Sequence, residues 1–501
     1  MKHSKIDFKD VQGLVRYGYG RLPESCFLLL EIISPRAARD WLKTLDVADA
    51  EELSTPPDFA LQVAFTYSGL RKIGLSSEIA DQFSQEFKTG IYEESRSKRL
   101  GDVGENAPRE WQWGGDSDNT PHLMLMLYSV KGGLEAPKNA TVDGLSSAGL
   151  ALRGCLTSAD FGGVEPFGFK DGISQPTVDW DGKRKLDGRD ELEYGNLVAL
   201  GEFLLGHRNE YGKYTDRPLL DLANDPRGIL AEAEDKPGKK DFAFNGTYLV
   251  FRQLQQHVGR FWKFLDDQVG GDRSERQRLA ELMVGRKMGG EALAVKSSSP
   301  IPGVDSDQRD ANQFTFSSDP DGTCCPFGAH VRRANPRNAD LPDGTRGLLS
   351  KLIRTLGFGG KGFRGDLISS VRFHRILRRG VEYGEPLRVN NAIKNGGNEI
   401  GERGLHFICL NANISRQFEF IQGAWLSSTK FDGMTEESDP IIGNREAVSE
   451  CPFTNSFSIP QEAGLRRRIS GIPAFITVRG GSYFFLPGIR ALRYLSSLET
   501  D

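Results

Sequence analysis

Cysteine is sparse in this chain, and its spacing argues against two kinds of protein. The 501 residues include only six cysteines, and no two of them form a C-x-x-C pair. Disulfide-rich secreted folds and structural zinc sites both depend on closely spaced cysteines. We therefore expect each cysteine to be a small buried side chain rather than part of such a framework.

Long apolar runs are also missing, and neither sign of charge predominates. The longest runs, CFLLLEII and HLMLMLYSV, fall well below the ~18 residues that cross a bilayer. The first residues, MKHSKIDFKDVQG, lack the apolar segment of a secretory signal. With 64 Lys and Arg against 68 Asp and Glu, the net charge is −4, whereas nucleic-acid-binding domains are usually basic. These features predict a cytoplasmic protein with no membrane span and no nucleic-acid partner; an oligomer is possible.

The length and a recurring sequence unit predict two domains. A chain of 501 residues exceeds the ~250–300 at which one hydrophobic core stops growing. An apolar, strand-like run followed by an amphipathic, helix-like stretch recurs twice in each half. The polar stretch EDKPGKKD separates the halves and has the composition of a linker or exposed loop. We place the domains at 1–235 and 236–501. The four units are residues 26–45, 59–75, 246–267 and 404–422.

Further strand-like runs indicate the fold class. HLMLMLYSV in the first half and AFITVRGGSYFFLPG near the end are both predicted strands. Within the second run, TVRGGSYFF resembles a hairpin, because two glycines interrupt its apolar residues. Strands with intervening helices and hairpin-like neighbours predict α+β halves with mainly antiparallel sheets.

A glycine-rich stretch could be taken for a nucleotide site. LGFGGKGFRGD contains the spacing G-x-G-x-x-G at Gly357, Gly359 and Gly362. A dinucleotide fingerprint must follow a strand and open a helix, so that backbone amides point at the pyrophosphate. The preceding LLSKLIRTL is helix-like and no clear helix follows, so we favour a surface loop over a nucleotide-dependent enzyme.

One histidine stands out among the seven. His330 lies in CPFGAHVRRANPR, among small and apolar residues and directly before three arginines. No histidine pair has zinc-enzyme spacing, but one histidine suffices when a porphyrin supplies the other equatorial ligands. Arginines just beyond the ligand suit the two haem propionates, because guanidinium groups pair with carboxylates. The alternative is that Arg332, Arg333 and Arg337 lie on a solvated face.

Two more stretches contain charged residues in unusual surroundings. PFGFKDGISQP places Asp171 between aromatic and glycine-rich residues, where the backbone can approach a bound group closely. Its alternative is a simple Asp-Gly turn. RILRRGVEYG presents Arg378 and Arg379 beside a predicted strand end, and its alternative is an exposed strand edge.

Taken together, the three stretches resemble the dye-decolorizing peroxidase family of haem enzymes. GFKDG matches the family's G-x-x-D-G signature, GAHVRRANPR its proximal-histidine segment, and ILRRGVEYG its distal-arginine segment. The motifs stand in the family order and the resemblance covers nearly the whole chain. The length and the insertion between His330 and Arg378 are most similar to the larger subfamilies that include the fungal enzymes. The resemblance implies two ferredoxin-like halves with peripheral helices, and haem b (iron protoporphyrin IX) between the sheet and helices of the C-terminal half.

The resemblance also implies a role for each matching residue. His330 becomes the axial ligand of the haem iron, Asp171 the distal acid–base residue, and Arg378 the distal cation. An aspartate with an ordinary pKa of ~3.9 is deprotonated over most of the working range and can accept a proton. An arginine stays cationic and can stabilise developing negative charge. The other implied residues are Arg337 and Arg332 at the propionates, Leu405 and Phe407 as the apolar wall of the peroxide pocket, and Asp439 as hydrogen-bond acceptor for His330.

The implied activity is that of a haem peroxidase. Hydrogen peroxide would be the oxidant, and phenolic, anthraquinone-dye or similar small organic reductants would be oxidised through a ferryl intermediate. The alternative is a haem-handling protein for storage, sensing or iron release, which has no need of Asp171 paired with Arg378. The chain departs from the family at Pro166, where histidine is frequent, so no second imidazole is expected on the distal side.

Overall fold

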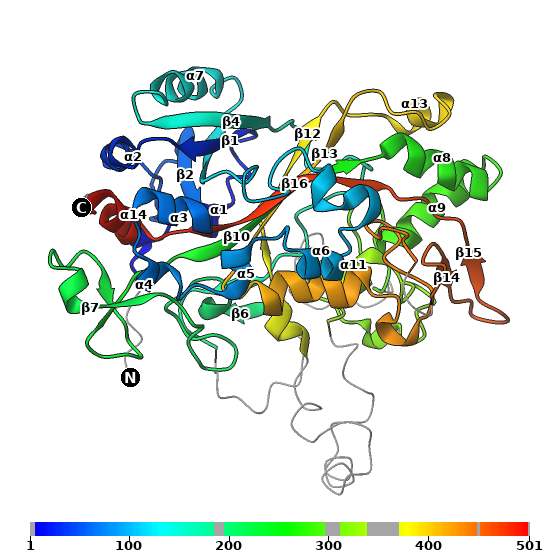
Figure 1. Cartoon of the computed structure of the whole chain (residues 1–501). Coiled ribbons are helices and arrows are strands. Elements are labelled where there is room, and N and C mark those ends of the chain that lie inside the picture. Colours follow the sequence, from blue (N-terminus) through cyan, green and yellow to red (C-terminus); the bar gives the residue numbers. More distant parts are fainter. Residues whose placement is uncertain (1–5, 185–194, 296–310, 338–369, 448–450, 499–501) are drawn as a thin grey trace, which may run out of the picture.

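A computed structural model of the chain describes residues 6–184, 195–295, 311–337, 370–447 and 451–498 (Figure 1). Its centre is a nine-stranded sheet in the order β11-β13-β10-β16-β2-β3-β1-β4, with β12 also paired to β13. All of its strand pairs are antiparallel. The strands are β1 (Glu24–Ile32), β2 (Phe59–Phe65), β3 (Leu123–Ser129), β4 (Leu150–Thr157), β10 (Thr247–Gln256), β11 (Leu377–Arg378), β12 (Val381–Gly384), β13 (Arg403–Asn411) and β16 (Ile476–Leu486).

The sheet consists of two halves with the same topology. In the N-terminal half the order is β4-β1-β3-β2, and in the C-terminal half it is β16-β10-β13 followed by β11 and β12. In each half the first strand lies between the fourth and the third, which is the ferredoxin-like arrangement. The halves meet where Phe485 of β16 pairs with Phe65 of β2. The predicted α+β class with two ferredoxin-like halves is therefore confirmed.

The predicted linker is part of a small sheet. β8 (Ala231–Glu232) pairs with β9 (Lys239–Asp241), which also pairs with β7 (Leu219–Asp221). The proposed boundary between residues 235 and 236 lies in the connection from β8 to β9, and the two-domain division remains a prediction. The other short strands are β5 (Thr177–Asp179), parallel to β6 (Leu197–Ala199), and β14 (Phe457–Ile459), antiparallel to β15 (Arg467–Ile469).

Helices cover both halves of the sheet, with α2, α3, α7 and α14 near the N-terminal strands and α8 and α9 near the C-terminal ones (Figure 1). The α-helices are α1 (Leu14–Tyr17), α2 (Pro35–Leu42), α3 (Tyr67–Ile73), α4 (Ser77–Ala80), α5 (Gln85–Thr89), α6 (Glu94–Leu100), α7 (Glu135–Gly144), α8 (Val258–Gln268), α9 (Arg273–Val284), α11 (His330–Ala334), α13 (Val389–Lys394) and α14 (Ile489–Ser497). Two π-helical segments are η8 (Ser415–Glu419) and η9 (Ile421–Ser427). The 3₁₀ turns are η1 (Phe8–Asp10), η2 (Gly104–Asn106), η3 (Pro108–Glu110), η4 (Leu200–Glu202), η5 (Leu222–Asn224), η6 (Phe316–Ser318), η7 (Ser370–His374) and η10 (Phe431–Gly433).

Burial on both faces explains why the strands read as continuous apolar runs. In β1, Cys26 and Leu28 belong to one hydrophobic core, whereas Phe27 and Leu29 belong to another on the opposite face. A strand covered on both faces has no polar side, so its sequence does not alternate. The sheet is thus the middle layer of the molecule.

All four predicted strand-then-helix units are confirmed. They correspond to β1 with α2, β2 with α3, β10 with α8, and β13 with the π-helical pair η8 and η9. Local signals fix where the helices begin. At α2, for example, Ser34 accepts a hydrogen bond from the Ala37 amide at 3.4 Å, and Pro35 takes the first helical position.

The expected hairpin in TVRGGSYFF is wrong. The whole segment belongs to the single strand β16, which passes through Gly480 and Gly481 with a register shift opposite Gln253 and Leu254. A Cβ atom on Gly480 would lie 2.3 Å from the indole nitrogen of Trp113. Gly480 therefore allows Trp113 to pack closely against the strand, and the two glycines do not form a turn.

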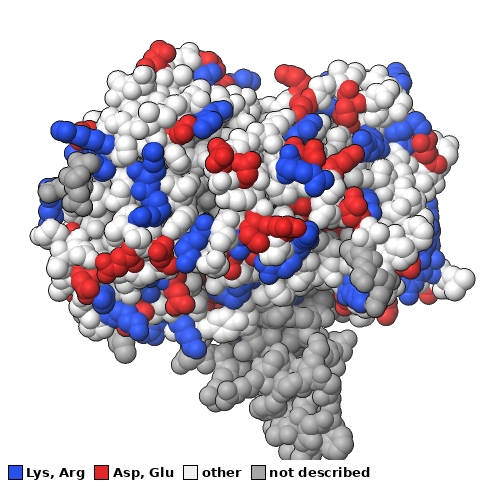
Figure 2. Space-filling view, viewed as in Figure 1, with Lys and Arg blue, Asp and Glu red and all other residues white. Residues whose placement is uncertain are grey.

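Two further expectations concern the glycine-rich stretch and the absence of a membrane span. The G-x-G-x-x-G stretch at residues 357–362 lies outside the described residues. Within the described ranges, no helix is both long and apolar enough to cross a membrane. Figure 2 shows basic and acidic side chains interspersed on the visible face, without a large region of one sign.

Candidate active site

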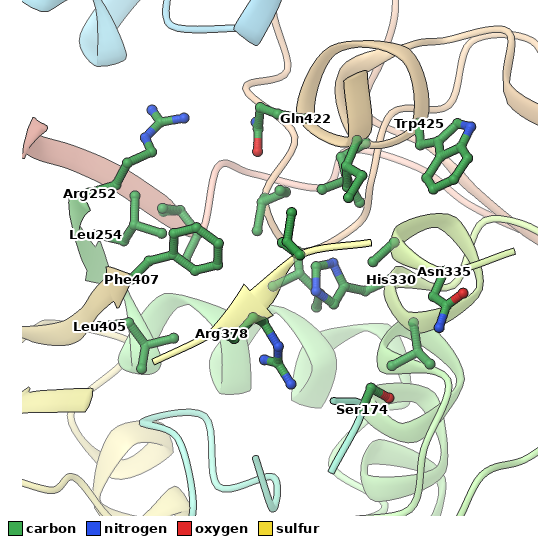
Figure 3. A pocket seen from close by; sticks show the side chains of 18 of the residues that line it. Ser174, Arg252, Leu254, His330, Asn335, Arg378, Leu405, Phe407, Gln422 and Trp425 are labelled. Carbon is green, nitrogen blue, oxygen red and sulfur yellow. The ribbon is translucent and has the colours of Figure 1, made fainter. Parts of the chain in front are cut away.

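A mostly apolar cavity lies between the C-terminal strands and several helices and loops. Its volume is about 290 Å³. β10, β13 and β16 supply one side, α11 and η9 another, and a loop from the N-terminal half, residues 165–174, completes it. Figure 3 shows His330, Arg378, Leu405 and Phe407 directed into this space from three different elements. Five of the eight predicted site residues line the cavity, namely Asp171, His330, Arg378, Leu405 and Phe407.

His330 is held by a buried carboxylate. It is the first residue of α11, and its Nδ1 lies 2.9 Å from Oδ2 of Asp439. Asp439 is fully buried, and its Oδ1 accepts hydrogen bonds from the amides of Ile441 and Ile442 at 2.8 and 2.9 Å. Nδ1 therefore donates to the carboxylate, and none of the described residues bonds to Nε2 of His330. That nitrogen is available to a ligand in the cavity.

The charge of Asp439 also acts on the imidazole. Burial lowers the pKa of His330, but the charge of Asp439 and its hydrogen bond outweigh this effect, so the pKa is raised. A carboxylate that accepts the second N–H of a histidine fixes the tautomer and makes the ring a stronger donor to a metal. The structure thus places Asp439 where a partner of an axial histidine is needed.

Asp171 and Arg378 form an ion pair on the cavity wall. Nη1 of Arg378 donates to Oδ1 of Asp171 at 2.8 Å, and the side chains are 29% and 34% exposed because both face the cavity. Burial raises the pKa of Asp171, but the charge of Arg378, the amide of Gly172 and the charge of His330 together hold it below its ordinary value. The carboxyl is therefore an anion across the neutral and mildly acidic range.

The loop that carries Asp171 also positions Arg378. Gln175 donates through Nε2 to the Arg378 carbonyl at 2.9 Å and accepts from the Arg378 amide at 3.1 Å. These two bonds join the N-terminal loop to β11. Arg379 turns away and donates to the carbonyls of Leu14 and Val15, both at 2.8 Å. Of the two adjacent arginines, Arg378 is thus the one available to the cavity.

Glu165 anchors the same loop from within. Its carboxylate accepts hydrogen bonds from the amides of Phe167 and Phe169 at 2.9 and 3.0 Å, and from Gln256 of β10 at 2.7 Å. Burial nevertheless raises its pKa to about 7. The sequence contains no pattern that marks this residue, because its partners come from the loop's own turns and from a distant strand.

Replacing Glu165 by Gln should change how stability depends on pH. A carboxyl whose pKa is raised by folding binds more protons in the folded state, so wild-type stability falls as pH rises from about 4.5 to 7. The uncharged Gln variant should become more stable relative to wild type over this range, by up to about 3 kcal/mol. Denaturant unfolding of both proteins at several pH values measures this difference. A difference that stays constant with pH would show that Glu165 titrates normally.

Three of the predicted residues lie behind the cavity rather than in it, and one of these is Asp439. Arg332 stacks on the rings of Phe316 and Phe327, with its carbon Cζ 4.5 and 4.4 Å from their centroids. Arg337 lies 3.8 Å above Phe314 and donates to the Asn312 carbonyl at 2.7 Å. Neither arginine is among the cavity-lining residues. Both are fully buried, which rules out the solvated face, and their expected contact with the propionates stays a prediction.

Other cavity residues were not predicted from the sequence. Arg375 lies three residues before Arg378, its Nη2 donates to Asn196 at 2.9 Å, and it lines the cavity. The RILRR stretch contained this signal, since a third arginine stands at its start. Arg286 and the buried pair of Arg252 with Asp102 also line the cavity. In total the lining has five cationic side chains and three acidic ones: Lys170, Arg252, Arg286, Arg375 and Arg378 against Asp102, Glu165 and Asp171.

A second histidine lines the cavity. His374 stacks on Phe420 with 3.7 Å between ring centroids, and its Nδ1 donates to the carbonyl of Arg416. Trp425 of η9 also lines the cavity and lies edge-on to His374 at 5.3 Å. Irregular π-helical turns often occur at functional sites, and η9 contributes four lining residues: Ile421, Gln422, Trp425 and Leu426.

Comparison with known proteins identifies similar sequences over most of the chain. No protein-family model matched. The dye-decolorizing peroxidase msp1 of Mycetinis scorodonius is 28% identical over 466 residues, covering 89% of this chain and 78% of that protein. The dye-decolorizing peroxidase AauDyP1 of Auricularia auricula-judae is 26% identical over 98% of this chain and 87% of its own length. The multifunctional dye peroxidase DyP2 of an Amycolatopsis species is 27% identical over 87% of this chain and 82% of its own length.

Solved structures share the fold. The crystal structure of a fungal DyP-type peroxidase from Auricularia auricula-judae superposes with a TM-score of 0.71 at 25% identity, covering 99% of this chain and all of the other. A second crystal structure of a decolorizing peroxidase from the same fungus gives 0.72 at 24% identity over 98% of this chain. The duplicated ferredoxin-like sheet, the order of the three motifs along the chain and the similarity to these relatives lead to one conclusion: the chain is similar in sequence and in fold to the dye-decolorizing peroxidases.

Proposed function

We propose that this protein is a haem peroxidase that uses hydrogen peroxide to oxidise phenolic, anthraquinone-dye or similar organic donors. One observation supports this above all. Asp171 and Arg378 form an ion pair that lines the same cavity as His330. The Nδ1 of this histidine is hydrogen-bonded to the buried carboxylate of Asp439. The first pair suits proton transfer and charge stabilisation, and the second suits an axial ligand to iron.

The residues of the cavity fit haem b, which we propose as the cofactor. Nε2 of His330 is open to the cavity, the lining is mainly apolar, and the excess of two cationic side chains matches the two propionates. Arg375 and Arg286 are our additional candidates for propionate contacts, beside the earlier candidates Arg332 and Arg337. When bound, haem supplies the iron that exchanges electrons with peroxide and with the donor.

The chain's own residues would handle the proton and the charge. An Oδ atom of Asp171 would accept a proton from hydrogen peroxide in the cavity and would hold it for return to the oxygen that leaves as water, while haem, when bound, would supply the electrons for cleaving the O–O bond. Arg378 donates hydrogen bonds to the peroxide while it carries negative charge. Leu405 and Phe407 keep bulk water away from these groups, because their side chains form the apolar wall on β13.

A haem-handling protein without turnover is the alternative function. A carrier would need His330 and the apolar walls, but it has no use for a carboxylate paired with an arginine at the reacting position. A direct test is to load the purified protein with haem and measure oxidation of an anthraquinone dye with and without peroxide. Peroxide-dependent loss of colour supports the peroxidase. Stable haem binding with no dye oxidation would favour the carrier.

Replacing His330 by Ala should weaken haem binding by more than about 10–100-fold. Loss of a residue that only hydrogen-bonds to a metal ligand already lowers metal affinity by that range, and His330 is the proposed ligand itself. Absorbance titration of the purified protein with hemin measures the affinity. His374→Ala is the matched control, because His374 lines the same cavity but its Nδ1 bonds to the backbone carbonyl of Arg416 and its ring stacks on Phe420. We expect this control to bind haem as wild type does. The opposite pattern, with haem lost only in His374→Ala, would assign the axial position to His374.

Several finer expectations stay predictions. The physiological reductant is proposed only by class, as a small organic molecule oxidised by one electron at a time. A cytoplasmic location and the possibility of an oligomer likewise rest on the sequence alone. The proposed domains, 1–235 with the Asp171 loop and 236–501 with His330, would both contribute to the one cavity.

A further inference from the structure

Two of the six cysteines lie in contact far from the haem cavity. Sγ of Cys26 on β1 and Sγ of Cys155 on β4 are 3.1 Å apart, although the residues are 129 positions apart in the chain. β1 and β4 are antiparallel neighbours, in which Cys26 pairs with Thr157 and Leu28 pairs with Cys155. Residues opposite one another share a face of the sheet, and so do residues two apart in a strand. Both thiols therefore project from the same face, close enough to react with each other.

The two thiols differ in environment. Cys26 is fully buried in the hydrophobic core, whereas Cys155 is exposed on the edge strand of the sheet. Either sulfur can donate the hydrogen bond between them, and donation by the Cys26 thiol favours the thiolate of Cys155, so the pKa of Cys155 is lowered to about 7. From α7, Lys138 also favours the thiolate of Cys155, while Glu135 opposes it and holds Lys138 at 2.7 Å. Cys155 is thus the accessible nucleophile, and Cys26 is the buried partner that reacts second.

We propose that Cys26 and Cys155 are a peroxide-oxidisable dithiol that forms a reversible disulfide between β1 and β4. The Cys155 thiolate attacks one oxygen of hydrogen peroxide, the O–O bond breaks, and Cys155 becomes a sulfenic acid as hydroxide leaves. The sulfur of Cys26 then attacks the sulfur of Cys155, the S–O bond breaks, and water leaves with the proton of the Cys26 thiol. In sum, two thiols and one peroxide give one disulfide and two waters.

The disulfide would fasten the outermost strand of the N-terminal half. Among the described strands, β4 is the end strand of the sheet and pairs with β1. A covalent link to β1 closes a long loop in the chain, which restricts the unfolded state more than the folded one. The oxidised protein should therefore resist unfolding in the peroxide-rich conditions that a peroxidase meets.

Counting thiols in the haem-free protein tests this proposal independently of the proposed function, because no turnover is involved. Reduced wild type should show six reactive thiols under denaturing conditions. After treatment with hydrogen peroxide and removal of the excess, four should remain, and dithiothreitol should restore six. Peptide mapping without reduction should show the fragment with Cys26 joined to the fragment with Cys155. The oxidised form should unfold at a higher temperature than the reduced form.

Single substitutions separate the two roles. In Cys26→Ala, Cys155 should still be oxidised, more slowly, and dimedone should trap it as a sulfenic acid that finds no partner. In Cys155→Ser, Cys26 should stay reduced because it is buried. Wild type that keeps six thiols, or that loses two thiols without a Cys26–Cys155 crosslink, would overturn the proposal. Equal thiol loss in Cys155→Ser and wild type would overturn it as well.

Discussion

Replacing Asp171 by Asn is expected to slow the reaction of the haem-loaded protein with hydrogen peroxide by about 10²–10⁴-fold, the usual cost of losing an acid–base group. Asn has nearly the same shape and can still accept a hydrogen bond from Arg378, so the cavity should keep its form and its haem. It cannot accept the peroxide proton. Stopped-flow measurement of the change in the haem absorption spectrum, at several peroxide concentrations, gives the rate constant.

The pH dependence of the rate constant is a second test of the same variant. In wild type the rate depends on the anionic form of Asp171, so it should persist above the lowered pKa and decline as pH falls through it. The Asn variant has nothing to protonate at this position, and its residual rate should lack that acidic decline. Haem content and the spectrum of the resting protein should match wild type. An unchanged rate constant in Asp171→Asn would remove this residue from the reaction.

Replacing Arg378 by Leu should lower the same rate constant by about 10²–10³-fold, the range for loss of one charge-stabilising donor. Leu fills much of the space but offers neither positive charge nor hydrogen bonds to the peroxide anion. Because His330 and Asp439 are untouched, haem should still bind. The stopped-flow assay used for Asp171 measures the effect, with haem affinity determined in parallel.

A second readout tests whether Arg378 also acts on Asp171. The charge of Arg378 is a main reason why the pKa of Asp171 lies below its ordinary value. In Arg378→Leu the pKa of Asp171 should rise, so the acidic decline in rate should move to higher pH. Arg378→Lys keeps the charge and is the matched control, with a smaller loss of rate and a smaller shift. Equal profiles for Arg378→Leu and wild type would mean that the ion pair has no part in the reaction.

Local sequence patterns were sufficient to predict the strands but not how some of them end or pair. Apolar runs such as HLMLMLYSV are long and bounded by polar residues, so β3 was found. The glycines at 480 and 481 suggested a turn, but the structure explains Gly480 by its contact with the indole of Trp113, which is 367 residues away in sequence. A close approach between distant segments leaves the same mark on a sequence as a turn does.

The candidate site follows the same rule. His330, Asp171 and Arg378 lie in distinctive local motifs, and all three line one cavity. Glu165 and Gln175 have no such mark, since Glu165 bonds to its own loop and to Gln256 of a distant strand, and Gln175 bonds to Arg378 on β11. Arg332 and Arg337 illustrate the reverse case. Their positions beside His330 indicated propionate binding, which stays a prediction, whereas nothing in the local sequence indicated that aromatic rings and backbone carbonyls of the preceding segment contact both side chains.

The meeting of β16 with β2 has a consequence for assembly. Only one residue pair, Phe485 opposite Phe65, joins the ladders of the two halves in the described sheet. Gln175 from the N-terminal half is hydrogen-bonded to the backbone of Arg378 in the C-terminal half. Residues of both halves line the cavity that would hold the porphyrin. Separately expressed halves should therefore bind haem poorly on their own, and hemin should promote their association, because residues of both halves line the one cavity.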